Sequence, residues 1–159
     1  MQTIASRVAG RLASRRTRTI LWSVLIVAAL TAVAGTAAAT RDGARESAMK
    51  AAISLKALGF DFRDEFSLGL LEEGDKAVVR TTLLRGNDYA LVAGGCSDAM
   101  DVDIQVYDED WDLVEQDRDS EDVAVVQVSP RFTGEYYVVV RMYSTRGDAA
   151  HWVLVTGYK

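Results

Sequence analysis

The amino-acid sequence predicts an all-β fold, an antiparallel, eight-stranded, jelly-roll-like β-sandwich preceded by a signal segment and one short α-helix. Short segments of alternating apolar and polar residues recur through residues 65–159 at spacings of roughly ten residues, with turn residues between them. In one of these segments Val102, Ile104 and Val106 alternate with polar side chains, as in a strand with one buried and one solvated face. Another, residues 135–142, is a long β-branched and aromatic run that follows a turn.

Residues 1–39 have the three parts of a secretory signal. They contain five arginines and no acidic residue, then an apolar run over residues 20–33, then small residues up to Ala39. We expect cleavage after Ala39, so that the mature protein is secreted or periplasmic. The alternative is an uncleaved single-pass anchor, because residues 20–39 would span about 30 Å as a helix. Both alternatives place the rest of the chain outside the cytoplasm, and the intact mass of the exported protein distinguishes them.

Residues 40–64 are predicted to form a helix and a linker. The stretch 42–58 has apolar residues at helical spacing, with Asp42 as a candidate N-cap and Gly59 after the end. Its apolar stripe is rich in alanine, which favours packing on its own domain over docking to a partner; both alternatives stay open. Residues 60–62 are expected to be a short linker whose two aromatic side chains contact the domain.

The predicted sandwich occupies residues 65–159, enough for one core that buries roughly 60% of the surface of the unfolded chain. Turn residues separate its strands at 72–75, 86–88, 108–112 and 117–122. The expected strands are 66–70, 77–83, 89–93, 101–107, a return strand from 113, 123–128, 135–142 and 151–156.

Charge and cysteine content exclude several classes of function. All 23 acidic residues lie in residues 40–159, against 13 of the 18 basic ones, so this part carries a formal charge of −10. Such a domain repels nucleic acids and anionic lipids; contact with a membrane is expected only through residues 20–39. The single cysteine, Cys96, excludes an internal disulfide and a cysteine-based metal cage.

Three short motifs stand out in the predicted sandwich: the turn and strand at residues 85–89, the D-x-D strand that begins at Asp101, and Thr133-Gly134-Glu135-Tyr136. Together they resemble the bacterial pre-peptidase C-terminal domain and its relative, the collagen-binding module of clostridial collagenases. The resemblance implies a β-sandwich fold. Alternation also places Tyr136 inward, where its hydroxyl needs a backbone partner close by, as in a tyrosine corner.

The region between Asp98 and Asp122 contains twelve acidic residues and one basic residue. Some members of the family that this chain resembles bind calcium through loop carboxylates, and calcium requires several oxygen ligands. The candidate ligands, which meet only if two loops lie side by side, are Asp98, Asp101, Asp103, Asp117 and Asp119. The alternative is a solvated acidic edge that prevents strand pairing between molecules. A calcium-specific rise in melting temperature would distinguish the two.

Four aromatic residues are candidates for a ligand-binding face: Tyr107, Trp111, Tyr137 and Trp152. Trp111 is the most unusual, because an indole rarely lies in a turn. The alternative is that these rings pack over one end of the sandwich.

The sequence contains no legible acid–base pair, catalytic triad or metal-ligand set, so we expect no enzymatic activity and no cofactor, except possible calcium. A nucleophilic Cys96 would need the only histidine, His151, beside it; a buried, inert thiol is the other interpretation. The favoured function is an exported, non-catalytic module that binds a protein or glycan of the cell envelope. The alternative is a structural accessory protein that assembles through its helix and is stabilised by calcium.

Overall fold

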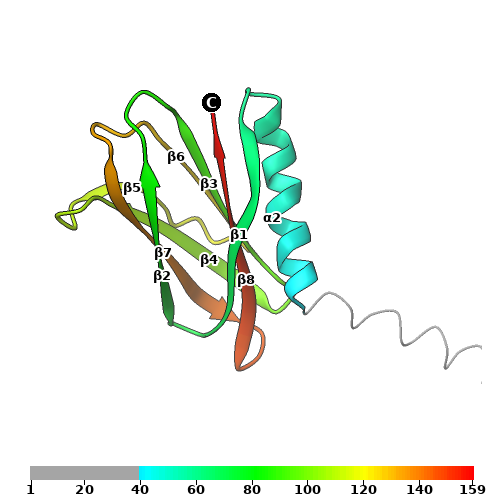
Figure 1. Cartoon of the computed structure of the whole chain (residues 1–159). Helices are drawn as coiled ribbons and strands as arrows, with labels where there is room; N and C mark the ends of the chain where they lie inside the picture. The colour runs from blue at the N-terminus through cyan, green and yellow to red at the C-terminus, as the bar shows by residue number, and fades with distance from the viewer. Residues whose placement is uncertain (1–39) are drawn as a thin grey trace, which may run out of the picture. The chain divides into compact units, whose positions relative to one another are not determined.

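The computed structural model describes residues 40–159; the predicted leader, residues 1–39, lies outside this range. Eight antiparallel strands form two four-stranded sheets, and one helix lies beside them (Figure 1). Sheet A has the strand order β1-β8-β3-β6, and sheet B has the order β2-β7-β4-β5. The predicted eight-stranded antiparallel sandwich with a preceding helix is therefore confirmed.

The elements are α2 (Arg41–Lys56), β1 (Asp61–Glu72), β2 (Lys76–Leu83), β3 (Tyr89–Gly95), β4 (Ala99–Tyr107), β5 (Leu113–Asp117), β6 (Val123–Val128), β7 (Gly134–Thr145) and β8 (Ala149–Tyr158). The expected linker is the start of β1, because Asp61 and Phe62 already pair with Tyr158 and Gly157. An irregularity between Phe62 and Phe66 separates this short piece from the rest of the strand. Within residues 40–159, no helix is long and apolar enough to cross a membrane.

Helix α2 begins at a different cap from the one expected. The side chain of Thr40 accepts a hydrogen bond from the amide of Gly43 at 3.2 Å, while Asp42 lies in the first turn, where its charge favours the helix dipole. The buried residues of the helix are Ala44, Ala48, Ala52 and Leu55. They pack on β3 and β8 of sheet A. The prediction of packing on the helix's own domain is confirmed, and the apolar stripe is not available to a partner.

Gly94 sets how closely the helix approaches the sheet. A Cβ atom on Gly94 would lie 2.8 Å from the Cα of Ala48 and 2.9 Å from the carbonyl oxygen of Ala44. Backbone thus contacts backbone here, with only small side chains on the helix side. Because α2 covers this face at β3 and β8, every residue of β3 is buried, whereas Phe66, Leu68 and Leu70 of the edge strand β1 stay exposed on the same face.

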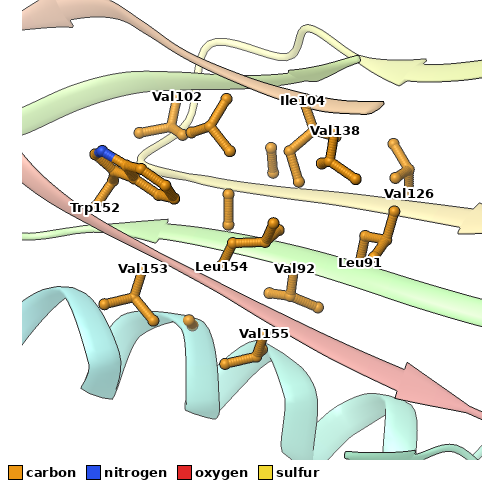
Figure 2. Close-up of a cluster of buried hydrophobic side chains, with 14 of the residues drawn as sticks. Leu91, Val92, Val102, Ile104, Val126, Val138, Trp152, Val153, Leu154 and Val155 are labelled. Carbon is orange, nitrogen blue, oxygen red and sulfur yellow. The ribbon is translucent and has the colours of Figure 1, made fainter. Parts of the chain in front are cut away.

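The core fills the space between the two sheets (Figure 2). Val102, Ile104 and Val138 of sheet B face Trp152 and Leu154 of sheet A. The odd-numbered residues of β8 point the other way, and Val153 and Val155 face α2 (Figure 2). This alternation in a strand with two buried faces explains the nearly continuous apolar sequence of β8.

Two residues of the sequence motifs, Gly86 and Tyr136, have the local geometry that the sequence predicts. Gly86 has φ of 97°, a conformation that favours glycine. Tyr136 is buried, and its hydroxyl donates a hydrogen bond to the carbonyl oxygen of Phe132 at 3.2 Å. The inward orientation of Tyr136 and its local backbone partner are therefore confirmed.

We predict that Gly94→Ala destabilises the protein by about 1–3 kcal/mol, because the added methyl group requires the helix backbone to move. Gly147→Ala is the matched control, since a Cβ there meets nothing within 4 Å. Urea unfolding midpoints measure both effects. Equal, small shifts would mean that α2 does not rest on Gly94.

We also predict that Tyr136→Phe lowers the unfolding free energy by about 1 kcal/mol, because Phe132 loses a buried hydrogen-bond donor. The comparison is Tyr137→Phe, whose hydroxyl makes only an exposed 3.5 Å contact with Glu135. That variant should stay within about 0.5 kcal/mol of the parent. Chemical denaturation of the two variants measures both changes in unfolding free energy. Equal losses would contradict the conclusion that Tyr136, and not Tyr137, makes the stabilising hydrogen bond.

Candidate binding face

The outer face of sheet B has no helix over it within residues 40–159. Strand alternation and the pairing register place one set of side chains there: Lys76, Val78 and Arg80 from β2; Asp103, Gln105 and Tyr107 from β4; Gln116 from β5; and Glu135, Tyr137, Val139, Arg141 and Tyr143 from β7. Of these, Val78 is 55% exposed. One ion pair, Arg80–Glu135 at 3.4 Å, lies across the face between exposed side chains. We call this set, with Trp111, the sheet B face.

The hairpin between β4 and β5 holds Trp111 in an unusual backbone conformation. Its φ is 63°, the only positive φ at a non-glycine residue in the part of the chain described. The carboxylate of Asp108 stabilises the turn by accepting hydrogen bonds from the amides of Asp110 at 3.1 Å and Asp112 at 2.9 Å. The amide of Trp111 donates to the carbonyl oxygen of Asp108. A bulky residue in this region costs about 1–3 kcal/mol, and such strain is typical of functional positions.

This conformation places the indole over two tyrosines of the sheet B face. Trp111 stacks on Tyr137 with a centroid distance of 4.5 Å and an interplanar angle of 5°. It contacts Tyr107 in a tilted arrangement at 5.6 Å and 47°. Trp111 nevertheless remains 53% exposed. The hairpin therefore holds the indole of Trp111 against the two tyrosine rings and leaves the rest of the indole exposed to solvent.

Of the four predicted aromatic residues, the structure brings together Tyr107, Trp111 and Tyr137. Trp152 does not join them, because it points into the core and is only 4% exposed. It fits there because its neighbour on β1 is Gly69, where a Cβ would lie 2.8 Å from the indole nitrogen. Trp152 also belongs to an interior strand, since β8 lies between β1 and β3.

The two loops that carry the five predicted calcium ligands lie side by side. The amide of Gly95 donates to the carbonyl oxygen of Asp122, and that of Val102 to the carbonyl oxygen of Glu121, each at 2.8 Å. The carboxylate of Asp117 is occupied by protein donors, the amides of Val125 at 2.7 Å and Asp119 at 3.1 Å. Asp98, the fifth candidate, lies in the turn before β4 and accepts the amide of Arg146 through its carbonyl oxygen.

No group of three or more His, Cys, Asp or Glu side chains within residues 40–159 has the arrangement of a metal site. The loops converge, but the five carboxylates do not form one cage. Calcium binding by these residues stays a prediction.

Asp101 and Asp103 are buried carboxyl groups on the outward side of β4. Burial, followed by the negative charge of Asp103, raises the pKa of Asp101; the charge of Arg141 and a hydrogen bond with Ser120 only partly offset this rise. Burial also raises the pKa of Asp103, against the opposing charges of Arg141 and Arg118. Arg141, whose charge opposes both rises in pKa, places its guanidinium 4.7 Å from the ring centroid of Tyr143.

Cys96 and His151 are neighbours through their backbones, because the amide of Cys96 donates to the carbonyl oxygen of His151 at 3.0 Å. The side chains are placed differently. Nδ1 of His151 lies 3.4 Å from the carbonyl oxygen of Gly69, and Cys96 is buried. The buried state of the thiol matches the second interpretation of Cys96.

A cavity of about 420 Å³ opens on the other side of the Trp111 hairpin, between β5 and β6. Leu113, Val114, Val128, Phe132 and Tyr136 supply its apolar lining. Sequence reasoning missed this site. The available signal was the pair Leu113 and Val114, two apolar residues in succession in a strand surrounded by acidic residues.

No protein-family model matches the chain, and no curated protein matches its sequence. Among solved structures, the chain is similar to PliG of Aeromonas hydrophila, a periplasmic inhibitor of g-type lysozyme, with 14% identity and a TM-score of 0.47 over 60% of this chain and 85% of PliG. It is also similar to a de novo designed double-stranded β-helix, with 9% identity and a TM-score of 0.34 over 58% of this chain and 97% of that one. Similarity this distant carries no inference about function.

We predict that Asp101→Asn raises the melting temperature at pH 7. The folded-state pKa of Asp101 lies above its ordinary value, so the ionised carboxyl group destabilises the folded protein at higher pH. This cost disappears when the pH falls below the ordinary pKa of the unfolded chain. The advantage of the variant should therefore shrink as the pH is lowered through the raised pKa.

Thermal melts between neutral and acidic pH measure this effect. Asp64→Asn removes the same charge from an exposed position on β1 and serves as the control. A stability difference between Asp101→Asn and the parent that is independent of pH would contradict the prediction.

Proposed function

We propose that this chain is an exported, non-catalytic module that binds a protein of the cell envelope through the sheet B face. The observation that carries the proposal is Trp111, which is held at φ of 63° and stacked on Tyr137 while more than half of it is exposed. A fold that needed only a hairpin turn would place glycine or asparagine at this position, because those residues adopt positive φ at little cost. Backbone strain that keeps a large aromatic side chain exposed is typical of a binding site.

The composition of the sheet B face favours a protein partner over a glycan. Tryptophan, tyrosine and arginine dominate the residues that contribute most to protein–protein binding, and they act best at the centre of an interface with apolar neighbours. Trp111, Tyr137 and Arg80 lie near one another on the register of β2 and β7, and Val78 continues the exposed face beside the buried Val139.

The export part of the proposal rests on the predicted leader, residues 1–39. A relation to the pre-peptidase C-terminal domain rests on the three short motifs alone. A structural accessory role through α2 is less favoured, because the apolar stripe of the helix is already packed on sheet A.

The proposal is tested with immobilised protein comprising residues 40–159 and an envelope extract of the source cells. We expect specific capture that Trp111→Ala reduces at least tenfold, as for a central interface tryptophan whose truncation costs about 2 kcal/mol or more. Tyr158→Ala is the control, since it removes an aromatic residue that is 43% exposed on sheet A.

Two treatments of the extract distinguish the classes of ligand. Loss of capture after protease digestion supports a protein partner. Capture that survives the protease but is lost after periodate oxidation assigns a glycan and overturns the protein assignment. Capture that Trp111→Ala leaves unchanged overturns the role of the sheet B face.

A further inference from the structure

The cavity between β5 and β6 lies where the two sheets separate at one side of the sandwich. β5 is the last strand of sheet B and β6 the last strand of sheet A, so both present a free edge here. At one end the amide of Val125 on β6 donates to the carboxylate of Asp117 on β5, which holds the two edges together. Further along, the edges enclose a cavity of about 420 Å³. This volume is within the range of natural ligand pockets.

The wall of the cavity is aromatic and aliphatic. Phe132 and Tyr136 stack with a centroid distance of 5.4 Å and an angle of 21°, and Val128 lies beside them. Leu113 and Val114 line the opposite side from β5, and they are 49% and 40% exposed. Apolar side chains with this much exposure on an edge strand are available to the hydrophobic stem of a ligand.

The rim of the cavity is acidic. Asp108, Asp112 and Glu115 line it, against one basic residue, Arg131. The salt bridges within residues 40–159 include none to these acids. Burial raises the pKa of the Tyr136 phenol, and its hydrogen bond to Phe132 opposes this rise; the negative charges of Asp108 and Glu109 add to the rise, and Arg131 opposes them.

We propose that this cavity takes an arginine side chain of the protein partner. The inference rests on the proposed function, because it names the chemistry of a partner that binds beside Trp111. The aliphatic stem of an arginine packs on Leu113 and Val114, and its planar guanidinium reaches the carboxylates of Asp112 and Glu115. The guanidinium also stacks on the half-buried ring of Phe132, which the buried Tyr136 supports from the core side.

The negative charge around the cavity favours a cationic occupant. Residues 40–159 carry a formal charge of −10, and the hairpin that bears Trp111 contributes four acids within five residues, Asp108 to Asp112. A basic partner is attracted to this end of the domain over a distance set by the ionic strength, and a carboxylate partner is repelled. Asp108 and Asp112 of the hairpin that bears Trp111 line the cavity, so the aromatic surface and the cavity adjoin the same turn.

The test uses two small probes with residues 40–159: N-acetyl-arginine methylamide and its neutral isostere N-acetyl-citrulline methylamide. In an amide NMR titration we expect the arginine probe to shift the signals of Leu113, Val128 and Phe132, with at least about tenfold weaker binding of the citrulline probe, since charge-assisted hydrogen bonds are lost. Equal binding of both probes, or no shifts at these residues, would overturn the inference.

The double variant Asp112→Asn/Glu115→Gln should weaken the arginine probe by roughly tenfold. Asp108 is left unchanged because it stabilises the turn. Asp64→Asn/Glu72→Gln on β1 removes the same charge at exposed positions far from the cavity in the strand order and should leave binding unchanged. An equal loss in both double variants would assign the effect to net charge and overturn the site.

The two proposals fail in different ways. If the arginine probe does not bind while protease-sensitive capture still depends on Trp111, the cavity assignment is wrong and the proposed function stands. If Trp111→Ala leaves capture unchanged, the proposed function fails whatever the probe does.

Discussion

The close contact between α2 and Gly94 is the constraint on which the arrangement of this protein depends. Three alanines of the helix lie on β3 and β8, and at Gly94 the backbones of helix and strand meet with no side chain between them. This contact covers the outer face of sheet A at β3 and β8. These two strands are then a buried layer between the helix and the core, and sheet B is the sheet without a helix on its outer face in the part of the chain described.

That asymmetry explains why the unusual features of the molecule gather on one side. The hairpin after β4 holds Trp111 in a strained conformation, and the residues that support its indole come from β4 and β7 of sheet B. The buried carboxyl groups Asp101 and Asp103 lie on the same strand as Tyr107. The strand edges that leave a cavity, β5 and β6, adjoin the same hairpin.

Local patterns in the sequence were sufficient for most of the fold. Strict alternation along residues 101–107 and 135–142 gave the inward faces of β4 and β7, because a strand with one solvated face must alternate. The same rule placed Tyr136 inward, and its hydroxyl bonds Phe132 as expected. The rule was less informative for β8, where both faces are buried and the sequence is almost continuously apolar. Trp152 was therefore placed on a surface when it belongs to the core.

The sequence by itself determined the strand content, the helix, the acidic character of residues 40–159 and the turn that contains Trp111, because each is a property of neighbouring residues. Only the tertiary structure decided which face has no helix over it, because that depends on where α2 packs, and its residues Ala44 and Ala48 lie far before Gly94 in the chain. It also decided that Trp111 meets Tyr137 and that Leu113 and Phe132 line one cavity, since these residues come from separate segments of the chain. Such contacts follow from strand order, and nothing in the local pattern of a strand specifies its neighbours in the sheet.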